Sequence, residues 1–299
     1  MERTLRSKVA GGELVLSVLG AESALLPIVI LGGISGNRDA INSNGTGWWQ
    51  GLAEALNPTA CQLIMVDYAG GTGESEVTPL PQTIGEQAAL VSAALQQHSL
   101  TEFHAVVGGS YGGLVALELA QDRNLQFNRL AIIGAAHRPT AQSVMLRALQ
   151  REFVRLGDAA DQPERGVQLA RALAMLSYRS AAGMDQFYPD PQDAVAYIGS
   201  RGLRTVQRSL PRARQLFEVF GPALDAYRIE PSQIDQPTLL IGFDSDQLVP
   251  PSVLNEFAQG LTDCRGCHIF SSTYGHDGFI KSTHDYAAIL AEFLELPCS

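Results

Sequence analysis

Short apolar runs alternate with amphipathic stretches along much of this 299-residue chain. Continuous apolar runs between turn residues are typical of strands buried on both faces, and apolar residues at helical spacing indicate the helices that cover them. The pattern predicts strands at residues 14–19, 27–31, 62–67, 103–107, 129–134, 237–242 and 267–270, and helices at residues 48–56, 84–97, 114–120, 253–261 and 286–294. This alternation predicts the α/β class, with a mostly parallel central sheet covered by helices on both faces.

The alternation stops between residues 140 and 235. This segment is rich in arginine, has a helical pattern and contains no convincing strand. Prolines interrupt it at positions 163, 189, 191, 211 and 222. We therefore predict a core formed by residues 1–139 and 236–299, into which a helical lid is inserted at residues 140–235.

Composition and charge narrow the classes of partner. Hydrophobic residues make up 45% of the chain and charged residues 17%, as in a globular protein, and the net charge is −10. An acidic chain is a poor match for nucleic acid or for an anionic membrane surface. Residues 1–8 have no apolar core of the kind found in signal peptides, and the apolar run at 24–31 is too short to cross a bilayer. We expect a cytoplasmic protein with small-molecule substrates, no nucleic-acid partner and no membrane partner.

Neither the CxxC motif at residues 264–267 nor the glycine-rich stretch at residues 67–75 is interpreted as a binding site. Cys264 and Cys267 form a CxxC, but no second Cys/His pair at zinc spacing accompanies it, so we expect no metal site and free thiols at these positions and at Cys61 and Cys298. The glycine-rich stretch at residues 67–75 follows a predicted strand but lacks the Lys-Ser/Thr ending of a P-loop. We interpret it as a tight loop at a strand end.

The strongest chemical motif surrounds Ser110. Gly108-x-Ser110-x-Gly112 lies between the predicted strand at 103–107 and the predicted helix at 114–120. A G-x-S-x-G sequence in this strand–turn–helix context is the pattern of a nucleophile elbow, in which glycines permit a sharp turn and the helix N-terminus faces a developing anion. The alternative is a glycine-rich strand end with a buried serine.

A serine nucleophile needs a base and a group that orients the base. His276 follows the last predicted strand in a glycine-containing loop and is our candidate base, with His137 as the alternative. Asp246 follows the preceding strand, in the required chain order Ser, Asp, His, and Asp244 competes with it. The oxyanion hole should use the N–H after the nucleophile, at Tyr111, and one from the glycine loop at 32–35, which we assign to Ile34.

Further motifs resemble the homoserine O-acyltransferase family. They are Gly-Gly-Ser-x-Gly-Gly at the elbow, Gly47-Trp48-Trp49, Ser245-Asp246-x-Leu248 before Pro250, Tyr274-Gly275-His276-Asp277-Gly278-Phe279, and residues 166–171 followed by Ser177-Tyr178-Arg179-Ser180. The resemblance implies the α/β-hydrolase fold and transfer of acetyl or succinyl from coenzyme A to homoserine, in methionine biosynthesis, by a ping-pong mechanism through an acyl-serine. No cofactor would be bound, and acetyl-CoA or succinyl-CoA would be the co-substrate.

The same resemblance assigns roles to individual residues. Ser110, Asp246 and His276 would form the catalytic triad, Arg171 and Asp277 would bind the amino-acid acceptor, and Tyr178 would belong to the substrate site. Two copies of the chain would dimerise through the lids.

Some points stay open at this stage. The lid segment before Gly166 is shorter than in typical members, and Tyr111 stands where the family usually has Met or Leu, so acetyl and succinyl both remain possible donors. Serine is an alternative acceptor. A plain ester or thioester hydrolase would use the same triad, and a hydrolase-fold receptor without activity is a third reading.

Overall fold

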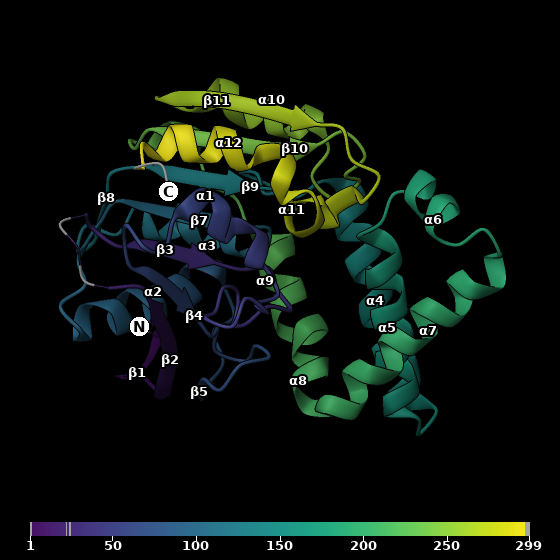
Figure 1. Cartoon of the computed structure of the whole chain (residues 1–299). Coiled ribbons are helices and arrows are strands. Elements are labelled where there is room, and N and C mark those ends of the chain that lie inside the picture. Colours follow the sequence, from purple (N-terminus) through teal and green to yellow (C-terminus); the bar gives the residue numbers. More distant parts are fainter. Residues whose placement is uncertain (1, 22, 24, 297–299) are drawn as a thin grey trace.

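The computed structural model describes residues 2–21, 23 and 25–296, and within these ranges it has one large sheet (Figure 1). The strand order is β1-β2-β4-β3-β7-β9-β10-β11, with the short β5 paired to β2. The strands are β1 (Glu2–Val9), β2 (Gly12–Leu19), β3 (Ile28–Leu31), β4 (Leu63–Val66), β5 (Glu76–Val77), β7 (Ala105–Gly109), β9 (Leu130–Ile133), β10 (Thr238–Phe243) and β11 (Cys264–Phe270). The pairs from β4 to β11 are parallel, whereas β1, β2 and β5 pair antiparallel. The α/β-hydrolase architecture expected from the sequence is confirmed.

Two strands differ from the sequence prediction. β1 was not predicted, because most of its side chains face solvent at the sheet edge and it has no apolar run. The strand expected at 103–107 is divided at His104, whose Nε2 lies 2.6 Å from the carbonyl oxygen of Leu294. The residues before His104 form β6 (Glu102–Phe103), which pairs with β8 (Gln126–Phe127) outside the main sheet, and those after it form β7.

Helices cover both faces of the sheet. One apolar core lies between the sheet and α2 (Ile84–Gln97), α3 (Tyr111–Leu119) and α10 (Pro251–Gly260). A second core lies on the opposite face against α1 (Ala53–Leu56), α11 (Gly278–Lys281) and α12 (Thr283–Leu294). Successive residues of the central strands point alternately into the two cores, so that Val29 and Leu31 enter the first and Ile28 and Ile30 the second.

The helix predicted at residues 48–56 is shorter than expected. A 3₁₀ turn, η1 (Gln50–Leu52), precedes the single-turn α1. Trp48 and Trp49 lie before it with stacked rings, and the buried Nε1 of Trp49 donates to the carbonyl oxygen of Phe279 at 2.8 Å. These aromatic contacts hold the chain in a turn where its apolar spacing alone favoured a helix.

A helical insertion, the segment between β9 and β10, stands to one side of the sheet (Figure 1). It contains α4 (Ala141–Ala159), α5 (Pro163–Ser177), α6 (Ala181–Phe187), α7 (Pro191–Arg208), α8 (Leu210–Gln215), the π-helix η2 (Leu216–Phe220), α9 (Gly221–Ala226) and the 3₁₀ turn η3 (Pro231–Gln233). Prolines occupy the first turns of α5, α7, α8 and α9, where a missing N–H costs no hydrogen bond. Four of the five prolines that interrupt the helical pattern therefore mark where new helices begin, and Pro189 lies in the bend before α7.

None of the helices in the described part of the chain is both long and apolar enough to cross a membrane.

Backbone atoms are packed closely where the N-terminus of α3 meets the end of β3. A Cβ atom on Gly112 would lie 2.0 Å from the carbonyl oxygen of Leu31, and one on Gly108 would lie 2.5 Å from the carbonyl oxygen of Gly112. Both contacts are with backbone atoms, which cannot move away as a flexible side chain could. Only glycine fits at these two positions.

We expect Gly112→Ala to lower the free energy of unfolding by about 3 kcal/mol, because the added methyl group overlaps the end of β3. The matched control is Gly199→Ala in α7, where a Cβ would meet nothing within 4 Å. This control should raise the free energy of unfolding by about 0.5–1 kcal/mol, the usual gain in a helix interior. Urea denaturation followed by circular dichroism measures both, and a Gly112→Ala protein as stable as the parent would contradict the packing described here.

Candidate active site

Ser110 occupies the turn between β7 and α3. Its φ of 53° and ψ of −120° lie outside the regions that non-glycine residues normally adopt. The Ser110 N–H donates to the carbonyl oxygen of Ile133 at 2.9 Å, and the Ser110 carbonyl accepts from the N–H of Gly113 at 2.9 Å. Strain of this kind persists only where neighbouring structure enforces it, and it is concentrated at functional sites.

His276 lies directly opposite the serine, in the 3₁₀ turn η4 (Gly275–Asp277) after β11. Its Nε2 is 2.7 Å from Ser110 Oγ, within hydrogen-bond reach across 166 residues of sequence. Gly275 has a φ of 62°, and a Cβ there would lie 2.8 Å from the carbonyl oxygen of Tyr178. A glycine is needed at this point because the turn packs against the end of α5.

Asp246 completes the arrangement from the loop after β10. Its Oδ2 is 2.7 Å from His276 Nδ1, and its Oδ1 accepts the backbone N–H groups of Leu248 at 2.8 Å and Val249 at 3.0 Å. The side chain of Asp246 is fully buried. A buried carboxylate with three donors is held in one orientation and in turn fixes the imidazole ring.

The two alternative residues lie elsewhere. Asp244 accepts the N–H of Ser272 at 3.0 Å and so shapes the neighbouring loop. His137 is buried with its Nε2 3.2 Å from a carboxylate oxygen of Glu256. The structure thus brings Ser110, His276 and Asp246 together and pairs Asp244 and His137 with other groups.

The pKa of His276 is raised above its ordinary value of 6.5. Burial by itself lowers the pKa of the imidazole, but the charge of Asp246 and the hydrogen bond to it favour the protonated form and outweigh burial. The neutral ring can accept a proton from Ser110, and the resulting imidazolium is stabilised by Asp246. This is the electrostatic requirement for a general base that activates a hydroxyl group.

A cavity opens above Ser110 between the sheet and the helical insertion. The core contributes Ile34, Ser110, Tyr111 and His276 to its wall, and the insertion contributes Arg147, Arg171, Tyr178, Phe217 and Tyr227, among others. Because both the core and the insertion form its wall, the cavity can limit the access of water to Ser110.

The two residues assigned to the oxyanion hole lie at the cavity floor. Tyr111 is the first residue of α3, so its N–H has no acceptor within the helix. Gly33 approaches the serine so closely that a Cβ on it would lie 3.8 Å from Ser110 Cβ, and Ile34 follows it on the cavity wall. The Tyr111 ring is buried between Tyr68 and Phe220, with ring centroids 5.1 and 5.0 Å away.

The residues assigned to acceptor binding are only partly brought together. Arg171 and Tyr178 both line the cavity, and the Arg171 guanidinium lies 5.8 Å from the centroid of the Tyr178 ring. The Nε of Arg171 is buried without a hydrogen-bond partner among the residues that the structure describes. Asp277 is adjacent to His276 but is not part of the cavity wall.

Sequence reasoning assigned no role to Arg179, the partner of Asp277. The Arg179 Nε lies 3.0 Å from Asp277 Oδ2, and both side chains are largely buried. Burial raises the pKa of Asp277, against the opposing effect of Arg179 and other charges. Arg179 belongs to the motif formed by residues 177–180, but nothing in the sequence connected it with a carboxylate 98 positions later.

Two further cavity arginines were also missed. Arg147 pairs with Asp225 at 2.6 Å, and Arg138 pairs with Glu256. Of the three arginines on the cavity wall, Arg171 alone forms no ion pair within residues 2–21, 23 and 25–296, although its charge acts against the rise in the pKa of Asp277. Helical spacing could have placed Arg147 in α4, but Arg138 lies in the bend before that helix, and the sequence identifies the partner of neither.

The CxxC cysteines lie in β11, away from the serine. Cys264 and Cys267 are free thiols, as is the buried Cys61, whereas Cys298 falls outside the described residues. No group of three or more His, Cys, Asp or Glu side chains suited to a metal ion occurs in the described part of the chain.

Comparisons with known proteins agree with this architecture. A family model described as the alpha/beta hydrolase fold matches residues 27–283. The homoserine O-succinyltransferase of Xanthomonas campestris pv. campestris is 30% identical over 293 residues, covering 93% of this chain and 77% of that protein. The homoserine O-acetyltransferase of Clavibacter michiganensis subsp. michiganensis is 28% identical over 300 residues, covering 84% of this chain and 77% of that protein.

A solved structure extends the likeness to three dimensions. The homoserine O-acetyltransferase of Staphylococcus aureus aligns with a TM-score of 0.82 and 20% identity, over 99% of this chain and 95% of that one. At this level of identity the likeness concerns the fold. It spans the helical insertion as well as the core.

We expect Asp246→Asn to slow acylation of Ser110 by p-nitrophenyl acetate about 10³- to 10⁴-fold, because the imidazole loses its orienting charge. The acid limb of the pH–rate profile should start above pH 6.5, since the pKa of His276 is raised, and the rate should fall as the pH falls through it. Asp246→Asn should move this limb to lower pH. Asp244→Asn is the matched control and should retain the parental rate, because an amide oxygen can still accept the N–H of Ser272. Similar losses in the two variants would contradict the arrangement described above.

Proposed function

The chain belongs to the homoserine O-acyltransferase family of the α/β-hydrolase superfamily, and from this premise we propose that it transfers an acyl group from acyl-coenzyme A to the hydroxyl group of L-homoserine in methionine biosynthesis. The observation that carries the proposal is the Ser110–His276–Asp246 chain of hydrogen bonds at the floor of a cavity into which the unpaired Arg171 faces. We take Ser110 as the nucleophile, His276 as the base and Asp246 as the residue that orients it.

The proposed reaction has two half-reactions. His276 takes the Ser110 proton while Oγ attacks the thioester carbonyl, the C–S bond breaks, and the coenzyme A sulfur leaves with the proton from His276. The amides of Tyr111 and Ile34 stabilise the oxyanion. His276 then takes the proton of the homoserine hydroxyl, whose oxygen attacks the acyl carbon, and the bond to Ser110 breaks as Ser110 recovers its proton. No resident cofactor takes part, and acyl-coenzyme A is a co-substrate.

Acceptor binding is assigned to Arg171, Tyr178 and Asp277. A zwitterionic amino acid needs a cation for its carboxylate, and Arg171 has a guanidinium on the cavity wall with no ion-pair partner in the described ranges. Asp277 would meet the ammonium group at the edge of the site. Its pairing with Arg179 would then have to loosen or be shared.

The sequence leaves alternatives for the acyl donor, for the acceptor, and for water in place of an acceptor. This chain is similar both to a homoserine O-succinyltransferase and to homoserine O-acetyltransferases, so either succinyl-CoA or acetyl-CoA could be the donor. Serine is a second acceptor, and an ester or thioester hydrolase is the alternative in which water resolves the acyl-serine. The buried, unpartnered Nε of Arg171 favours an acceptor with a carboxylate over water, because a neutral water molecule would not compensate the charge of the guanidinium.

We further propose a homodimer formed through the helical insertion, acting in the cytoplasm. Met145, Leu149 and Leu156 lie on one side of α4 and are 66%, 54% and 62% exposed. An apolar stripe of this kind is typical of a protein–protein contact. The free thiols at Cys61, Cys264 and Cys267 suit a reducing compartment.

With acetyl-CoA or succinyl-CoA, we expect coenzyme A release that depends on homoserine, together with a Ser110 peptide that gains the mass of the acyl group when homoserine is absent. Arg171→Met should raise KM for homoserine about 10- to 100-fold, since a charge-assisted hydrogen bond is lost. It should leave Ser110 acylation nearly unchanged. Arg165→Met, at an exposed position of the same helix, is the control. Turnover at the same rate without homoserine would instead support the hydrolase.

We expect light scattering to give twice the chain mass of 32.1 kDa. Leu149→Glu should reduce this to a single chain by placing a charge in the apolar stripe of α4, whereas Gln121→Glu, which adds the same charge to an exposed position of the core, should leave the dimer intact. A parental protein that runs as a single chain at all concentrations would exclude this mode of assembly.

A further inference from the structure

Two glycine-rich loops lie side by side at the end of the sheet. The Ile34 loop, residues 32–39, follows β3, and the Asp67 loop, residues 67–75, follows β4. The Tyr68 hydroxyl donates to the carbonyl oxygen of Gly32 at 3.0 Å. The Thr72 hydroxyl lies 3.3 Å from the carbonyl oxygen of Ser35 and 3.0 Å from that of Gly36. The Asp67 loop, predicted from the sequence as a tight loop at a strand end, therefore holds the Ile34 loop from one end to the other.

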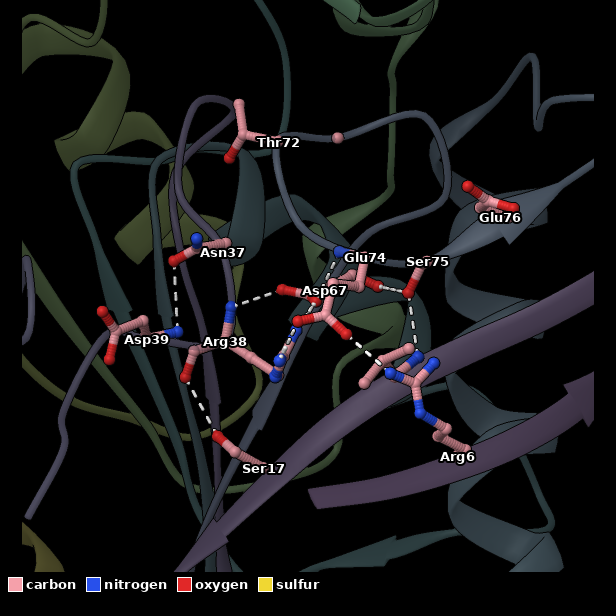
Figure 2. Close-up of polar contacts among 12 residues, drawn as sticks. Arg6, Ser17, Asn37, Arg38, Asp39, Asp67, Thr72, Glu74, Ser75 and Glu76 are labelled. Atoms are coloured by element: carbon pink, nitrogen blue, oxygen red, sulfur yellow. Dashed lines mark hydrogen bonds and ion pairs between the residues drawn. The ribbon is translucent and has the colours of Figure 1, made fainter. Parts of the chain in front are cut away.

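The strongest of these contacts is the pair formed by Asp67 and Arg38 (Figure 2). The Asp67 carboxylate is fully buried. It accepts the backbone N–H of Arg38 at 2.7 Å, a hydrogen bond from the Arg38 guanidinium, and the backbone N–H of Glu74 at 2.8 Å. The pair therefore fixes both the main chain and the side chain of Arg38.

Packing leaves this carboxylate no second position. A Cβ on Gly73 would lie 2.0 Å from Asp67 Cγ, so the Asp67 loop folds directly over the carboxylate. The other end of the Arg38 guanidinium contacts Glu74 at 2.5 Å, and Glu74 also pairs with Arg6 at 2.6 Å (Figure 2). Glu74 is half exposed, whereas Asp67 is not, so water screens the outer pair and not the inner one.

The Ile34 loop ends beside the nucleophile. Gly33 lies against Ser110, and the amide of Ile34 donates no hydrogen bond to any protein group in the described part of the chain. The loop carbonyls beyond it are all engaged, since Trp48 Nε1 donates to Asn37 at 2.9 Å and the Ser17 hydroxyl donates to Arg38 at 3.0 Å. A free amide in a loop anchored on both sides is the arrangement that an oxyanion hole requires.

We propose that Asp67 and Arg38 are positioning residues that hold the Ile34 amide at the place where the oxyanion of the Ser110 reaction forms. The proposal rests on the proposed function only in taking Ser110 as the nucleophile. Hydrogen-bond donors in an oxyanion hole act at a defined distance. A displacement of about 1 Å in the loop therefore reduces the stabilisation of the transition state without changing how tightly the substrate binds. The pair thus affects the rate of acylation rather than the affinity for the acyl donor.

The test compares Asp67→Asn with Glu74→Gln. Both remove one carboxylate from the Arg38 guanidinium. Only Asp67→Asn also places an NH₂ group, which cannot accept, where one of two accepting oxygens faces the N–H groups of Arg38 and Glu74. The measured quantities are the rate and KM of Ser110 acylation by p-nitrophenyl acetate and the inhibition constant of a boronic acid that mimics the tetrahedral oxyanion. We expect Asp67→Asn to lower the acylation rate about 10- to 100-fold. Inhibitor binding should weaken in parallel, while KM stays within about twofold.

Thr72→Val provides a second variant of similar volume at an exposed position, in case Asp67→Asn does not fold. It removes the two contacts to Ser35 and Gly36 and should lower the acylation rate and boronate affinity by a smaller factor, about three- to tenfold. Glu74→Gln should match the parent. A lower melting temperature with unchanged acylation and boronate binding in the folded variants would overturn the proposal, as would an equal loss in Glu74→Gln.

The assay contains neither coenzyme A nor homoserine, so it is independent of the acceptor. Acylation that depends on the Asp67 loop in a protein that does not use homoserine would overturn the proposed acyltransferase and leave the positioning role in place. Ser110→Ala gives the background rate. A parental protein that acylates no faster than Ser110→Ala would overturn the nucleophile, and the positioning role with it.

Discussion

The end of β3 and the start of α3 approach each other until their backbones touch. Gly112 faces the carbonyl oxygen of Leu31 with no room for a side chain, and Ser110, two residues before it, is held in a strained conformation with a positive φ. Because β3 lies beside β7 in the sheet, the loop that leaves Leu31 must pass next to Ser110. This contact between main-chain atoms therefore places Ser110, the free N–H groups of α3 and the start of the Ile34 loop next to one another.

The insertion adds what a bare hydrolase core lacks. It places Arg171 and Tyr178 on the wall of the cavity that contains Ser110, and the His276 turn packs against the end of α5. The arginines that share the cavity are not equivalent, since Arg147 and Arg138 have carboxylate partners and Arg171 does not. A cavity wall with a cation that has no ion-pair partner binds an anionic group more strongly than neutral water.

Local sequence predicted those features that depend on local chemistry. Buried strands, the turn at Ser110 and the loops that carry Asp246 and His276 all have signatures within a few residues, and parallel strands bring their carboxyl ends to one edge. β1 lacked such a signature because an edge strand is defined by its partner rather than by an apolar run. The pairing of Arg179 with Asp277, and of Arg38 with Asp67, depends on segments that meet only in the folded chain. The charge of an arginine does not identify which of the many carboxylates in the sequence will be its ion-pair partner.

The wide separation of Ser110 and His276 along the chain affects when their contact forms during folding. Ser110 and His276 are 166 positions apart, and every strand from β7 to β11 must be in place before their side chains can meet. Contacts of such long sequence separation form late, after the entropy of closing large loops has been overcome. Reaction of Ser110 with an activated ester therefore indicates that the fold is complete. A chain truncated before β11 would not react in that assay, even with the turn at Ser110 intact.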